Sequence, residues 1–197
     1  MYPVFLKLRG RRVLLVGGGR VAAAKLEALL ADGAHVTVVA PEIRPELHRP
    51  GVTIARRAFE SRDVDGVWYV VAAAPASVNK DVLTAAERQH VFVNAVDDPS
   101  HASAYAGSVV RRAGVTIAFS TDGRAPALAG LLREALDAWL PADLGEWMAA
   151  ADEARREWKQ NGVPMEDRRP MLLETLNRLY ERRSQLPVSS ARLPNPM

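Results

Sequence analysis

Apolar and polar positions follow a regular alternation of two patterns along residues 1–100. Short runs of β-branched and aliphatic residues, typical of buried parallel strands, occur at 13–16, 35–40, 52–55, 67–73 and 91–96. Stretches rich in helix-forming residues follow the first and fourth of these runs, at 21–31 and 77–89. Strands that alternate with helices predict an α/β domain with a parallel sheet and right-handed crossovers.

The first predicted helix has an apolar side and a clear end. Val21, Leu26, Leu29 and Leu30 lie near one face of this helix. Gly33 stands where a glycine commonly ends a helix.

The pattern changes after residue 100. Two β-type runs, 108–112 and 115–120, are separated only by Ala113-Gly114, which predicts a hairpin or paired strands. Pro126 suits the first turn of a helix, predicted to continue through 127–140. Two further helices are expected at 143–160 and 168–185, with a break at 161–164. A small α+β segment and a helical region therefore follow the parallel sheet.

Composition narrows the classes of protein. A chain of 197 residues with 48% hydrophobic residues suits one or two folded domains, and its net charge of +3 is too small to indicate nucleic-acid binding. The absence of cysteine excludes disulfides, thiolate nucleophiles and cysteine-based zinc sites. The N-terminus has too short an apolar run for a signal peptide, and no run reaches the roughly 20 residues that span a bilayer. We expect a cytoplasmic protein with no membrane partner.

A glycine-rich turn joins the first strand to the first helix. Gly17-Gly18-Gly19-Arg20-Val21-Ala22 fits the pattern G-x-G-x-x-A, and its place between a strand and a helix is the context that makes the pattern informative. The first glycine permits a tight turn, Gly19 lets the backbone approach a pyrophosphate, and Ala22 allows the helix to pack closely. The sequence therefore predicts a Rossmann-type domain that binds a dinucleotide.

The acid that usually holds the ribose is missing, because Ala40 stands at the end of the second strand. Three alternatives remain open: Glu42 reaches the ribose, backbone groups at Pro41-Glu42 do so, or Arg44 meets a 2′-phosphate and the cofactor is NADP. We expect NAD.

Candidate chemistry is concentrated after the fifth strand. Asp97 and Asp98 end it at the sheet edge where ligands of open α/β sheets bind, so either could be a general base or a turn former ahead of Pro99. Neighbours leaving a strand point in different directions, and at most one should face the cofactor. His101 is a further candidate in the same loop, or simply a loop histidine. The histidines show no metal-ligand spacing, and we expect no metal site.

Four stretches occur in a characteristic order: FLKLRGRRVLLVGGGRVAAAKLEALLADGAHVTVVAPE, VAAA, VNAVDDP and IAFSTDGRAPALAGLLREAL. Together they resemble the precorrin-2 dehydrogenase family, whose members occur alone or as the N-terminal part of siroheme synthase. The likeness runs from about Val4 to about Arg183. The family's turn reads SSGGTSP, whereas this chain has STDGRAP. No methyltransferase domain follows, so we expect the stand-alone form.

The resemblance implies NAD-dependent oxidation of precorrin-2 to sirohydrochlorin in siroheme biosynthesis, with Asp97 rather than Asp98 as the catalytic base. Expected cofactor contacts come from three strand ends and comprise Gly17, Gly18, Gly19, Arg20, Val21, Pro41, Glu42, Ala73 and Ala74. Expected substrate contacts comprise Asn94, Ser120, Thr121, Gly123 and Arg124. Because the substrate carries many carboxylates, Arg124 is a candidate clamp, or else an exposed turn residue.

The resemblance also implies a homodimer and a domain plan. We expect an NAD-binding Rossmann domain at 1–106, a dimerisation segment at 107–147, a helical domain at 148–185 and a disordered tail at 186–197. Three alternative functions stay open: a dehydrogenase that also inserts ferrous iron to make siroheme, a non-catalytic NAD-sensing module, and a tetrapyrrole carrier.

Overall fold

The computed structural model describes residues 2–184, which form two compact units. The first unit contains the residues up to 108 together with 119–130, and the second contains 109–118 and the residues from 131 onward. The predicted tail at 186–197 lies outside the described residues. The domain boundaries expected after residues 106 and 147 stay predictions.

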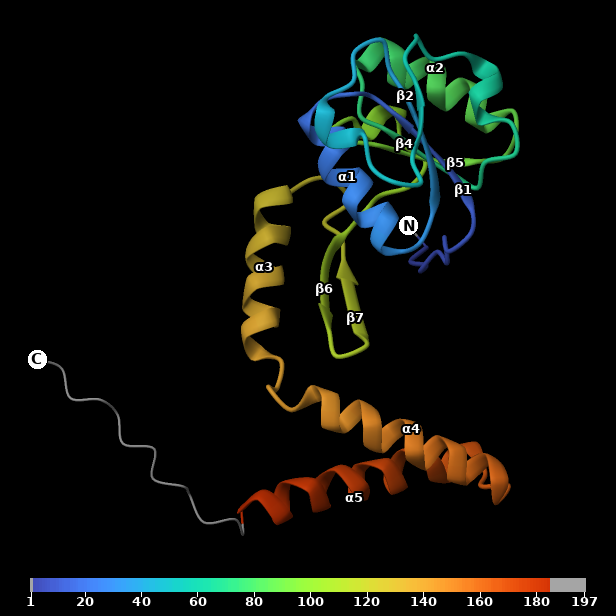
Figure 1. The fold of residues 1–197 in the computed structure, drawn as a ribbon. Coiled ribbons are helices and arrows are strands. Elements are labelled where there is room, and N and C mark those ends of the chain that lie inside the picture. The colour runs from blue at the N-terminus through green and yellow to red at the C-terminus, as the bar shows by residue number, and fades with distance from the viewer. Residues whose placement is uncertain (1, 185–197) are drawn as a thin grey trace, which may run out of the picture. The chain divides into compact units, whose positions relative to one another are not determined.

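The first unit is built on a parallel sheet, as predicted (Figure 1). Its strands are β1 (Arg12–Val16), β2 (His35–Val39), β3 (Thr53–Ala55), β4 (Tyr69–Ala72) and β5 (Phe92–Ala95), in the order β3-β2-β1-β4-β5. The last residues of β1, β2 and β4 are register partners, and β4 and β5 also end together. The carboxyl ends therefore lie at one edge, and the strand order reverses between β1 and β4, which is where such sheets bind ligands.

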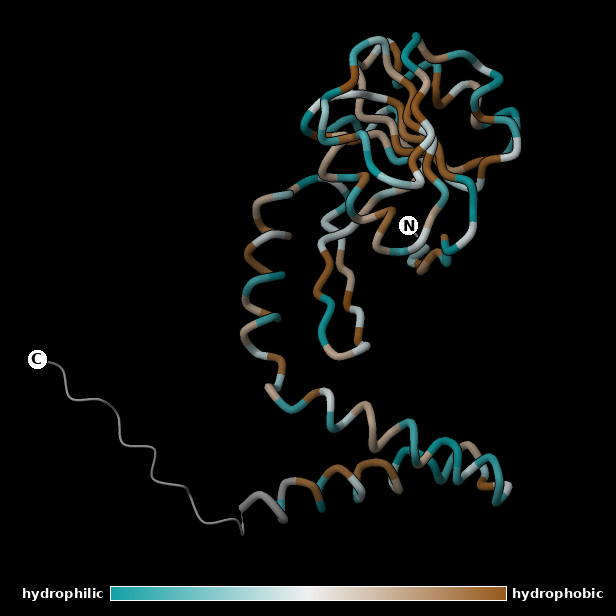
Figure 2. Tube along the Cα trace, viewed as in Figure 1, coloured by the Kyte–Doolittle hydropathy of each residue, from teal (hydrophilic) through white to brown (hydrophobic). Residues whose placement is uncertain are grey.

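Helices cover both faces of this sheet. α1 (Arg20–Ala31) contributes to the core that contains Val13 and Leu15, whereas α2 (Ala76–Glu87) contributes to the core that contains Leu14 and Val16. Successive residues of β1 thus alternate between two buried cores, which explains its continuous apolar run. Figure 2 shows the same concentration of hydrophobic residues along the strands. Short 3₁₀ turns precede and follow β3, namely η1 (Pro45–Leu47) and η2 (Ser61–Val64), and a third, η3 (Pro99–His101), follows β5.

The structure defines both ends of α1. Gly33 adopts a left-handed φ of 77°, and its N–H donates to Leu30, which confirms the expected helix end. Leu26 and Leu29 are buried, whereas 44% of Val21 is exposed. Ala22 takes the buried position in the first turn instead, which leaves Val21 beside the glycine turn.

The second unit contains most of a hairpin and the C-terminal helices. β6 (Ser108–Arg112) and β7 (Val115–Phe119) pair, which confirms the predicted hairpin. Ala113 and Gly114 both have positive φ angles, of 49° and 82°, as a two-residue turn of type I′ requires. The Arg112 guanidinium donates to the Leu140 carbonyl at 3.0 Å and to Asp137 at 2.8 Å, which anchors the hairpin to the segment from 131 onward.

The helices that follow are α3 (Pro126–Trp139), α4 (Leu144–Gln160) and α5 (Met165–Ser184). α5 begins at Met165 rather than at the predicted residue 168 and includes Pro170. Arg168 donates two hydrogen bonds to the Val163 carbonyl, at 3.1 and 2.8 Å, and so secures the earlier first turn. None of the helices in residues 2–184 is both long and apolar enough to cross a membrane.

Candidate functional site

The first two glycines of the turn after β1 are required by close backbone packing. Gly17 has a φ of 128°, and a Cβ atom there would lie 2.3 Å from the Ala73 carbonyl oxygen. A Cβ atom on Gly18 would lie 1.7 Å from the Glu42 carbonyl oxygen. The turn after β1 is therefore in direct contact with the chain that follows β4 and the chain that follows β2.

Gly19 differs, because its surroundings are open. It is exposed and starts α1 in an extended conformation, with no described atom within 4 Å of where a Cβ would stand. No described side chain caps α1, and its first turn holds no acidic residue. The free N–H groups and the positive end of the helix dipole thus face open space, which fits the pyrophosphate of a dinucleotide.

The loop after β2 explains the missing acid. Ala40 is only 6% exposed and packs in the core beneath α1, so its position could not hold a solvated carboxylate. Pro41 and Glu42 are exposed beside the glycine turn, and the Arg44 N–H donates to the Gly18 carbonyl at 3.0 Å. The Arg44 guanidinium is paired with Glu46 at 2.7 Å, and this hydrogen bond raises the pKa of Arg44.

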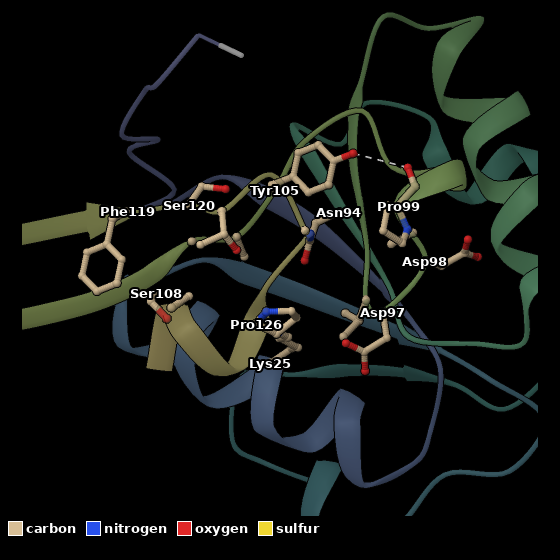
Figure 3. Close-up of a pocket in the computed structure, with 17 residues that line it drawn as sticks. Lys25, Asn94, Asp97, Asp98, Pro99, Tyr105, Ser108, Phe119, Ser120 and Pro126 are labelled. Carbon is tan, nitrogen blue, oxygen red and sulfur yellow. Dashed lines mark hydrogen bonds between the residues drawn. The ribbon is translucent and has the colours of Figure 1, made fainter. Parts of the chain in front are cut away.

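A cavity of about 400 Å³ lies in the first unit at the carboxyl end of β5. It is lined by residues 94–99, which end that strand, by 105–108 and by 119–121. Lys25 of α1 and Pro126 at the start of α3 complete its walls (Figure 3). The cavity therefore occupies the sheet edge at which Asp97 and Asp98 were expected to act.

Asp97 is exposed and has no hydrogen-bond or ion-pair partner among the described residues. Its backbone is left-handed, with a φ of 57°, a conformation that aspartate tolerates better than most residues. Figure 3 shows the carboxylates of Asp97 and Asp98 pointing in different directions. A carboxylate held in a cavity without a protein partner is free to accept a proton from a ligand.

Asp98, in contrast, is fully engaged. It accepts hydrogen bonds from Asn79 Nδ2 at 3.1 Å and from Ser100 Oγ at 2.8 Å, and His101 Nδ1 lies 2.9 Å from both its oxygens. These bonds lower the pKa of Asp98, with that from Asn79 having the largest effect. Buried Asn79 also accepts from the Ala74 N–H at 3.3 Å, so this network joins the loop after β4 to the loop after β5.

The structure brings most of the expected substrate residues to the cavity. Asn94 lines it while its amide donates to the Ala104 carbonyl at 3.2 Å. The hydroxyls of Ser120 and Thr121 accept from backbone N–H groups two and four residues later, which shapes the turn ahead of α3. Gly123 also lines the cavity, whereas Arg124 is exposed and does not. Their roles toward a substrate stay predictions.

Sequence reasoning missed Lys25. A signal was available, because Lys25 follows Val21 by one helical turn and so shares its face. Within residues 2–184, no group of three histidine, aspartate or glutamate side chains is placed to hold a metal ion.

Most of this chain is similar in sequence to proteins that are already known. It is 39% identical over 180 residues to the siroheme synthase of Photorhabdus laumondii and 41% identical over 172 residues to siroheme synthase 3 of Aeromonas hydrophila. These alignments cover 89% and 85% of the chain but only 38% and 37% of the relatives, so the chain spans less than half of their length. The solved structure of the precorrin-2 dehydrogenase SirC matches with a TM-score of 0.70 and 27% identity, covering 88% of each chain.

These similarities confirm the resemblance predicted from the sequence and the Rossmann-type fold with its C-terminal helical region. The family described as putative NAD(P)-binding matches residues 4–108, which contain the glycine turn, the strand ends and both aspartates. That match and the open helix start at Gly19 together support a nicotinamide cofactor. Because the match covers more than half of the sequence, the chain belongs to the putative NAD(P)-binding family.

Proposed function

We propose that this protein oxidises precorrin-2 to sirohydrochlorin with NAD, and that Asp97 is the general base. The observation that carries the proposal is the unpartnered Asp97 carboxylate, which lines a cavity at the sheet edge that also carries the glycine turn. The similarity to SirC over 88% of both chains supports the substrate class.

The reaction removes a hydride and a proton from the substrate. A nicotinamide held at the glycine turn would supply the hydride acceptor. Asp97 accepts the proton on a carboxylate oxygen and later releases it to water, so charge and atoms balance. The Asn79–Asp98–His101 network holds the loop on which Asp97 stands and joins it to Ala74 in the loop after β4, where a cofactor contact is expected.

We infer that the cofactor is NAD rather than NADP. A 2′-phosphate needs a free cation near the end of β2, and the candidate Arg44 is paired with Glu46. Glu42 is exposed beside the glycine turn and has no described partner, so its carboxylate is available to the ribose hydroxyls.

We further infer that the protein forms a homodimer through α3. Leu128, Leu131, Leu132 and Trp139 are 47–78% exposed and recur at helical spacing. A stripe of this kind on a helix is typical of a surface covered by a partner. Leu131→Asp should shift the mass measured by light scattering from dimer to monomer, while Glu134→Gln on the same helix should leave it unchanged.

The direct test is an anaerobic assay with precorrin-2 generated in situ. We expect NADH and sirohydrochlorin to rise together in equal amounts when protein and NAD are both present. NAD binding without either product would contradict the proposal and favour an NAD-sensing module. Binding of sirohydrochlorin without turnover would favour a tetrapyrrole carrier.

A further inference from the structure

Lys25 is the only positively charged side chain among the described residues that line the cavity. It projects from the middle of α1, is half-buried, and faces the same cavity as Asp97 (Figure 3). The remaining walls are neutral apart from Asp97 and Asp98. Because Asp98 is engaged by Asn79, Ser100 and His101, its charge is already compensated within the loop.

No carboxylate of the described residues pairs with Lys25. By contrast, Arg57 holds Asp63 with two hydrogen bonds, and Arg49 lies 3.5 Å from Glu27, on the same helix as Lys25. A half-buried ammonium group loses part of its hydration, and an anion is the acceptor that compensates this loss best. Lys25 is therefore placed to receive an anionic group from a ligand.

Two anionic groups could bind at α1, the pyrophosphate of the dinucleotide and a carboxylate of the substrate, and their sites lie at different points along the helix. The dinucleotide pyrophosphate fits the helix start at Gly19, which lies six residues before Lys25, or about 9 Å along the helix axis. None of the three glycines of the turn lines the cavity, whereas Asn94, Asp97 and Ser120 do. Lys25 thus belongs with the predicted substrate residues rather than with the cofactor turn.

We propose that Lys25 binds a carboxylate of the tetrapyrrole and so fixes the orientation of the ring above Asp97. The inference rests on the proposed function, because it takes the cavity occupant to be a polycarboxylate tetrapyrrole. An ammonium group on a flexible stem suits this task, since it can follow a carboxylate side chain that itself rotates. Lys25 is a specificity-determining residue in this view, and Asp97 remains the group that takes the proton.

The test is a titration of sirohydrochlorin, the proposed product, into the full chain, followed by fluorescence quenching. Lys25→Gln should weaken binding about tenfold, as expected for loss of one charge-assisted hydrogen bond, and should reduce its dependence on salt. Lys25→Arg retains the charge and should stay within about threefold of the wild type. Lys80→Gln is the matched control, because Lys80 is exposed on α2 and does not line the cavity.

NAD titrated into the same four proteins provides the second readout, and all four should bind it equally. Loss of NAD affinity in Lys25→Gln with unchanged sirohydrochlorin affinity would overturn the inference and assign Lys25 to the cofactor. Equal sirohydrochlorin affinity in all four proteins would also overturn it while leaving the proposed function intact. If the wild type binds no sirohydrochlorin, the proposed function fails first and the inference falls with it.

Discussion

The glycine turn and the cavity at the end of β5 lie on the same edge of one sheet but are built from different parts of the chain. At the glycine turn the site is formed by backbone atoms. Gly17 and Gly18 contact neighbouring loops, and Gly19 precedes the free N–H groups at the start of α1. In the cavity, side chains form the site: Asn94 comes from β5, Asp97 from the loop after it and Lys25 from α1.

The two regions should therefore respond differently to substitution. A backbone site depends on the absence of side chains, so adding one methyl group is enough to damage it. A side-chain site stands on backbone that other residues hold, and here the Asn79–Asp98–His101 network holds the loop. Substitutions in the first region should alter folding or cofactor binding, and those in the second should alter substrate binding or catalysis.

The largest expected effect comes from Gly18→Ala. The added Cβ would lie 1.7 Å from the Glu42 carbonyl oxygen, so the loop after β2 must move. We expect a loss of about 3 kcal/mol or more in the free energy of unfolding, or about 10 °C in Tm, measured by thermal and urea denaturation.

Gly19→Ala is the matched control for that prediction. Its Cβ meets no described atom and its extended backbone suits alanine, so stability should change by less than about 0.5 kcal/mol. Its NAD affinity should nevertheless fall about tenfold or more, because the methyl group occupies the approach to the helix start. Equal stability of the two variants would contradict the assigned difference between Gly18 and Gly19.

Asp97→Asn should have the next largest effect and should act on catalysis alone. Asparagine tolerates the left-handed backbone at this position, so the loop should keep its shape. Loss of the base should lower the rate of NADH formation from precorrin-2 by about 10²–10⁴-fold, while NAD binding measured by titration stays unchanged. A variant that retains more than about a tenth of the wild-type rate would exclude Asp97 as the base.

The glycine turn was predictable from the sequence because all the residues that define it are close together in the chain. A strand, a G-x-G-x-x-A pattern and a helix follow one another, so residues 13–31 contain the whole signal. The packing role of Gly18 was not predictable, since it depends on the chain around Glu42. The same holds for the Asn79–Asp98 contact, which joins residues from separate elements and is marked by no spacing in the sequence.

Asp98→Asn should reduce activity by no more than about tenfold, because it acts on the base only through the loop. The side-chain amide introduced in this variant would carry an N–H donor. That donor would lie against Asn79 or His101, which both contact the Asp98 carboxylate in the wild type. Since the folded pKa of Asp98 lies below its unfolded value, its contribution to stability is present above about pH 4 and is lost as the pH falls through the folded pKa.

The pH dependence of stability provides a second measurement for Asp98→Asn. The difference in unfolding free energy between the wild type and Asp98→Asn should be largest near neutral pH and should shrink in acid, as followed by urea denaturation at several pH values. A difference that is independent of pH would show that the ionised carboxylate does not hold the loop. A larger loss of activity than that of Asp97→Asn would reverse the assignment of the base.

The weakest effect is expected for Arg44, which lies beside the glycine turn. Its guanidinium is exposed and paired with Glu46, and such surface pairs contribute little to stability. Arg44→Ala should therefore change the KM for NAD by less than about threefold. Glu46→Gln releases the guanidinium and should improve the KM for NADP a few-fold without affecting that for NAD, because only NADP carries a 2′-phosphate. If Arg44→Ala instead weakens NADP more than about tenfold and the wild type already prefers NADP, the ion pair opens on binding and the cofactor is NADP.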